Sequence, residues 1–158
     1  MTTFIYGLEQ GRLTAGMRML ALAALVLLAS LFADRPASAA AVLNAAAANA
    51  NAGLSACSSS RGKALYNCVA DVLERMSNEI SSVRVPETQR ALQTAATRLR
   101  SASSKAEAVS AITQCQAAIA GALRQVKATG HAPGWGDSGL ASIAGVLARA
   151  AKLIQAKG

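Results

Sequence analysis

The sequence is poor in the residues that carry most enzyme chemistry and most β-structure. It has one histidine and three cysteines, and only five of its 158 residues are aromatic. Zinc and haem sites need several Cys or His at short spacing, and no C-x-x-C pair occurs. Three prolines exclude a collagen-like chain, and few β-branched or aromatic stretches argue against an all-β fold. We therefore expect no metal and no cofactor.

Alanine is abundant: it occupies 38 of the 158 positions. The chain is 53% apolar, with a mean hydropathy of +0.31. Because Ala is a strong helix former, this composition predicts helices. Lys and Arg outnumber Asp and Glu by 16 to 8, which gives a net charge of +8. A surplus of this sign favours acidic partners.

An apolar run at residues 21–33 follows two arginines and precedes a proline and an Ala-x-Ala site. This order is typical of a secretory signal peptide, so residues 1–39 are predicted to be removed before Ala40. Met17 is an alternative to Met1 as the true start. An uncleaved membrane anchor is the other interpretation, although a spanning helix takes about 20 apolar residues. The protein is accordingly expected to be periplasmic or secreted.

The mature chain would carry 13 Lys and Arg against 6 Asp and Glu, a net charge of +7. Residues 40–57 are rich in Ala and Asn and offer few large apolar side chains. A short helix with nothing to pack on is marginal in water, so this segment is predicted to be a spacer. Residues 58–158 are predicted to be the folded domain.

Four amphipathic helices are predicted in that domain, at about 60–83, 86–102, 104–129 and 138–157. Pro86 suits a first helical turn, and Ser104 with Glu107 forms a capping-box pattern. Short connections favour antiparallel neighbours. The expected fold is an all-α, small antiparallel bundle of about four helices.

The cysteines leave their pairing open. Cys68 and Cys115 fall on the apolar stripes of the first and third predicted helices, so an oxidising compartment would favour a disulfide between them. Cys57 is then the leftover thiol, although a Cys57–Cys115 bond competes. A Cys57–Cys68 bond requires an irregular segment at 58–61, because a helix would separate the two by about 16 Å. Leu-Ser-Ala-Cys57 also looks locally like a lipidation site, but it lies far from the apolar run.

Two short strings resemble enzyme motifs without their context. Gly136-Asp137-Ser138-Gly139 resembles the nucleophile segment of trypsin-like proteases, which need a β scaffold; a helix cap explains Asp137-Ser138 better. Ser60-x-x-Lys63 resembles the motif of penicillin-recognising enzymes, but their other motifs are absent. The carboxylates form no visible pair for acid–base chemistry. We expect no catalytic activity.

Basic side chains are the best remaining functional signal. The candidate contacts with an acidic partner are Arg90, Arg98, Arg100, Arg149 and Lys152. The single tryptophan of the chain, flanked by two glycines, is a candidate loop contact at Trp135. The sequence therefore predicts an exported, non-catalytic interaction module for an acidic envelope or extracellular partner; no small-molecule substrate is inferred and nucleic acid is not expected. The alternative is a peripheral membrane protein seated through the cationic amphipathic helix 138–157.

Overall fold

The computed structural model describes residues 38–129 and 137–158, and the predicted signal peptide therefore lies almost wholly outside the described residues. The described part is an all-α bundle without strands, as predicted. It holds five α-helices instead of about four. They are α2 (Ala39–Ala56), α3 (Gly62–Glu79), α4 (Pro86–Ser101), α5 (Lys105–Ala128) and α6 (Asp137–Lys157), with single 3₁₀ turns η1 (Cys57–Ser59) and η2 (Ile80–Ser82).

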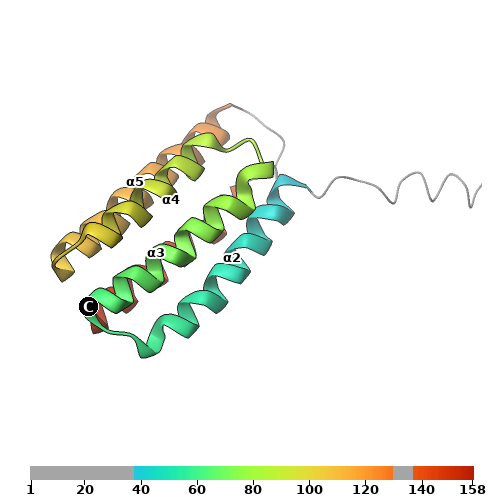
Figure 1. Ribbon diagram of the computed structural model, residues 1–158. Helices are drawn as coiled ribbons and strands as arrows, with labels where there is room; N and C mark the ends of the chain where they lie inside the picture. Colours follow the sequence, from blue (N-terminus) through green and yellow to red (C-terminus); the bar gives the residue numbers. More distant parts are fainter. Residues whose placement is uncertain (1–37, 130–136) are drawn as a thin grey trace, which may run out of the picture. The chain divides into compact units, whose positions relative to one another are not determined.

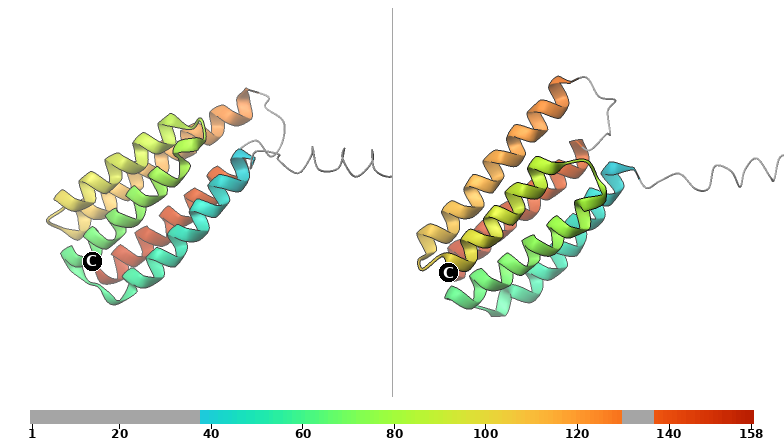
Figure 2. Two further views of the ribbon diagram at one scale, coloured as in Figure 1. Left: turned by 45° about the vertical axis from the view of Figure 1, so that its right-hand side comes forward. Right: turned by 45° about the horizontal axis from the view of Figure 1, so that its top comes forward.

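Each helix packs against the next along the chain, and α6 closes the ring by packing on both α5 and α2 (Figure 1). The two views of Figure 2 show consecutive helices running in opposite directions. As a consequence α2 and α6, the first and last helices, are parallel. Their hydrogen bonds keep a nearly constant offset along the chain, joining Asn44 to Ser142, Asn51 to Arg149 and Ser58 to Lys157.

The predicted spacer is wrong, because residues 39–56 form helix α2 and belong to the core. Leu43 and Leu54 are fully buried, together with the alanines between them that face the same way. Ser38 caps the helix, since its side chain accepts a hydrogen bond from the Ala41 N–H. The segment looked unable to pack because alanine occupies both its buried and its exposed faces, so no polarity difference marks the buried one.

Two glycines allow α2 to approach its neighbours closely. A Cβ atom added at Gly139 of α6 would lie 2.5 Å from the Leu43 Cβ, and one at Gly53 would lie 2.8 Å from a methyl group of Val72 on α3. Real Cβ atoms do not come this close to such groups. The close fit lets small alanine side chains of α2 reach buried contacts on both sides.

The boundaries predicted for the other four helices are confirmed within a few residues. Pro86 is the first residue of α4, and the Ser104 side chain caps α5 by accepting from the Glu107 N–H. The Glu107 carboxylate accepts hydrogen bonds from the Ser103 backbone N–H and hydroxyl. These bonds lower the pKa of Glu107, because they stabilise its charged form.

Three lysines cap helix C-termini at one end of the bundle. Lys63, near the start of α3, donates to the carbonyl oxygens of Arg100 and Ala102 at the end of α4. Lys105 donates to the Gln155 carbonyl near the end of α6, and Lys157 donates to the Ser58 carbonyl just after α2. Positive charge at a helix C-terminus offsets the helix dipole and satisfies carbonyl groups left without an intrahelical donor.

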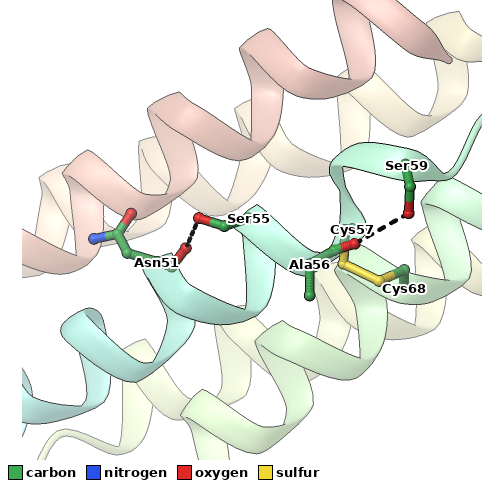
Figure 3. Close-up of a disulfide and its surroundings, with 6 residues drawn as sticks. All are labelled: Asn51, Ser55, Ala56, Cys57, Ser59 and Cys68. Carbon is green, nitrogen blue, oxygen red and sulfur yellow. Dashed lines mark hydrogen bonds between the residues drawn. A yellow bond between two sulfur atoms is a disulfide. The ribbon is translucent and has the colours of Figure 1, made fainter.

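The disulfide joins Cys57 to Cys68, so the predicted Cys68–Cys115 pair is wrong (Figure 3). After α2 the chain makes one 3₁₀ turn and then runs extended through Ser60 and Arg61. This irregular segment brings the Cα atoms of Cys57 and Cys68 to 5.7 Å. The prediction failed because it placed α5 beside α3, whereas α3 packs mainly on α4, α2 and α6. The leftover thiol is therefore Cys115, not Cys57.

Candidate partner-binding groove

A shallow groove follows the seam between α4 and α5. Small side chains meet there, so the two helices leave space along the surface instead of filling it. The central part of this groove is lined by Ala91, Ala95, Ala111 and Ala118 among other residues. A further hollow continues along the same seam and shares Arg98 and Ala111 with it. The seam thus offers an elongated concave surface.

Arg90, Thr94 and Arg98 line this groove from α4, one helical turn apart. At 1.5 Å per residue, the two arginines stand about 12 Å apart along the helix. Arg98 also donates a hydrogen bond to the Gln114 side chain of α5, which holds its guanidinium at the groove. Arg90 makes no hydrogen bond or ion pair with the described residues, so its guanidinium remains available. Glu87 is the one acidic residue among those that line this central part.

Cys115 also lines the groove, but it offers no reactive thiolate. Its side chain is only 3% exposed, and burial raises the pKa of the thiol to about 12. At neutral pH the thiol is protonated and behaves as a small apolar side chain. The groove therefore has the properties of a binding surface and lacks an activated nucleophile at this position.

Two of the five predicted basic contacts serve the fold instead. Arg100 forms ion pairs with Asp71, at 2.8 Å, and with Glu74 on α3. The hydrogen bonds to Asp71 and then Glu74 raise the pKa of Arg100. Arg149 donates to Asn51 and Ser55, which fastens α6 to α2.

Lys152 is exposed on α6 and makes no hydrogen bond or ion pair with the described residues. It lies on a different helix from the groove. The structure thus brings only Arg90 and Arg98 of the predicted set together in one concavity. Trp135, the predicted loop contact, lies outside the described residues.

The apolar face of α6 is buried inside the bundle. Among the described helices, α6 alone is long and apolar enough to cross a membrane by length and composition. Its apolar side chains nevertheless lie in the core, as Ile143, Leu147 and Ile154 show with no exposed surface. Seating this helix in a membrane surface would require those side chains to leave the core.

The described residues hold no group of three or more Cys, His, Asp or Glu that could bind a metal ion. The Ser60-x-x-Lys63 pattern is also accounted for, since the Lys63 ammonium is hydrogen-bonded to the end of α4. Sequence reasoning singled out Arg90 and Arg98 but missed the groove beside them. A usable signal was the pairs of alanines on α4 and α5, which predict a shallow seam only once the two helices are known to be neighbours.

Comparisons with known proteins bring no further assignment: no family model matches the chain, and neither a similar curated protein nor a similar solved structure was found.

Proposed function

We propose that this chain is an exported, non-catalytic binding module that holds an acidic segment of a partner protein in the groove between α4 and α5. The observation that carries the proposal is the placement of Arg90 and Arg98 in a single concave seam. Two guanidinium groups about 12 Å apart match carboxylates on an extended or helical segment. Arginine forms bidentate hydrogen bonds with carboxylates, which gives such a contact direction as well as charge.

Other charges on the described surface support this choice of site. Asp71 and Glu74 are neutralised by Arg100 on the α3 side of α4. The acidic residues nearest the groove are Glu87 and Glu107, in the central part and the adjoining hollow respectively. The middle of the groove therefore carries a local excess of positive charge. Export is supported by the apolar run at 21–33 and by the Cys57–Cys68 disulfide, a bond that persists mainly in oxidising compartments.

Fluorescence anisotropy with a labelled oligoglutamate peptide tests the proposal. We expect saturable binding to the full chain that weakens as salt is raised, because exposed charge pairs are screened. The double variant Arg90→Gln/Arg98→Gln should bind about tenfold or more weakly, since hydrogen bonds to charged groups contribute about 1.5–3 kcal/mol each. Melting curves would verify that the variant stays folded.

The matched control is Arg75→Gln/Lys152→Gln, which removes the same charge from exposed positions on α3 and α6. It should change the dissociation constant by less than about threefold if the groove is the site, because only the long-range field of the protein changes. Equal losses in both double variants would show that net charge alone attracts the peptide. Equal binding of a neutral oligoglutamine peptide would likewise contradict the proposal.

A further inference from the structure

A separate pocket lies at the end of the same seam, where the N-terminus of α4 meets α5 and the start of α6. Its volume is about 290 Å³. It shares only Glu87 with the groove of the proposed function. Its lining combines apolar with polar side chains, chiefly Val85, Val126 and Leu140 with Arg84, Thr88 and Gln125.

The helix N-terminus in this pocket has no cap of its own. Val85 occupies the N-cap position and has no side-chain acceptor, and Pro86 supplies no N–H group. The backbone N–H groups of Glu87 and Thr88 then have no acceptor among the described residues. Free N–H groups and the positive end of the helix dipole favour an anionic oxygen at this place.

Thr88 gives a second, independent indication of a ligand. It lies on the core-facing stripe of α4, one turn before Leu92, and is only 2% exposed. Its hydroxyl has no hydrogen-bond partner among the described residues, yet no fully enclosed side-chain oxygen there lacks one. The hydroxyl oxygen therefore still reaches solvent, and the pocket is the cavity that Thr88 lines. A buried polar group in an apolar stripe is costly unless something bonds to it.

We propose that this pocket binds a small monocarboxylate with a short apolar chain, of the class of medium-chain fatty acid anions. The carboxylate accepts hydrogen bonds from the N–H groups of Glu87 and Thr88 and from the Thr88 hydroxyl, and Arg84 supplies the opposite charge. The chain lies against Val126 and Leu140. The Glu87 carboxylate, which also lines the pocket, disfavours ligands with two negative charges such as phosphate. This site does not depend on the acidic-partner groove.

Titration of the full chain with sodium octanoate, followed by amide-resonance NMR, tests this assignment. We expect saturable shifts that centre on Glu87, Thr88 and Val126. Arg84→Gln and Thr88→Val should each weaken octanoate binding about tenfold, the effect of losing a charged hydrogen bond. Thr88→Val keeps the shape of the side chain, and Arg84 is exposed, so the second variant serves even if the first is unstable.

Matched controls separate this site from general effects. Arg75→Gln removes an exposed charge elsewhere, and Thr97→Val removes an exposed hydroxyl on α4; both should leave octanoate binding within about twofold, since neither residue lines the pocket. The Arg90→Gln/Arg98→Gln variant should bind octanoate normally even though it loses the acidic peptide, so the two proposals fail separately. Unsaturated shifts, shifts centred elsewhere, or octan-1-ol binding as tightly as octanoate would overturn the assignment.

Discussion

Removing the Cys57–Cys68 bond should destabilise the bundle without unfolding it. The two cysteines are 11 residues apart in the sequence. In the chain-entropy model a bond that closes a loop of this length stabilises the folded state by about 2.8 kcal/mol, because it restricts the unfolded chain. The core contacts of α2 and its hydrogen bonds to α6 do not involve the bond. Native-like helix content should therefore survive reduction.

The measurement is guanidinium denaturation followed by far-UV circular dichroism. Wild-type protein should show a lower midpoint when reduced, with a nearly unchanged native signal. The Cys57→Ala/Cys68→Ala variant should resemble the reduced protein under both conditions. Cys115→Ala is the control: it removes a buried sulfur but leaves the disulfide, so its midpoint should still fall on reduction.

Two results would refute this reasoning. One is a wild-type midpoint that does not respond to reductant, because the bond would then contribute nothing to stability. The other is a non-reducing peptide map that links Cys115 to another cysteine. In the folded, oxidised protein the one free thiol should also react slowly with thiol reagents, since Cys115 is buried and its pKa is raised to about 12.

Four further outcomes are expected. Leu147→Ala should lower the free energy of unfolding by about 2–5 kcal/mol, as measured by denaturation, because the side chain is fully buried. Gly139→Ala should cost about 1–3 kcal/mol through overpacking, whereas Gly145→Ala, which meets open space, should stabilise α6 in the same assay. Because the pKa of Glu107 is lowered in the folded state, its stabilising effect is present above the unfolded pKa and is lost as pH falls through the folded pKa; Glu107→Gln should therefore flatten the acid limb of a stability–pH curve. N-terminal sequencing of exported protein should begin at Ala40, and an uncleaved terminus would contradict the signal-peptide prediction.

The sequence was sufficient to predict helices whose two faces differ in polarity. In α3 the stripe containing Leu65, Val72 and Met76 stands against charged outer positions, and the helix formed where this contrast predicted it. In α2 no such contrast exists, since the segment contains no charged residue. Its buried face differs from its exposed face mainly through Leu43 and Leu54, so hydrophobic periodicity could not reveal it.

The error over α2 also explains the wrong disulfide. In a four-helix bundle the first and third helices can bring Cys68 and Cys115 near one another. The additional helix places α2 and α6 on the other side of α3 and gives Cys57 a position beside Cys68. A pairing that depends on which helices are neighbours cannot be obtained from the periodicity of single helices, because periodicity fixes which face is buried but not against what.

The same distinction separates the basic residues into two groups. Surface charge is visible in the sequence, but whether a guanidinium is occupied depends on the helix next to it. Arg149 meets the amide and hydroxyl groups of α2, and Arg100 meets two carboxylates on α3. Arg90 and Arg98 instead face a seam of alanines on α5, where no carboxylate of that helix lines the central groove. The alanine content that hid the fifth helix thus also leaves the concave, positively charged seam in which an acidic partner is proposed to bind.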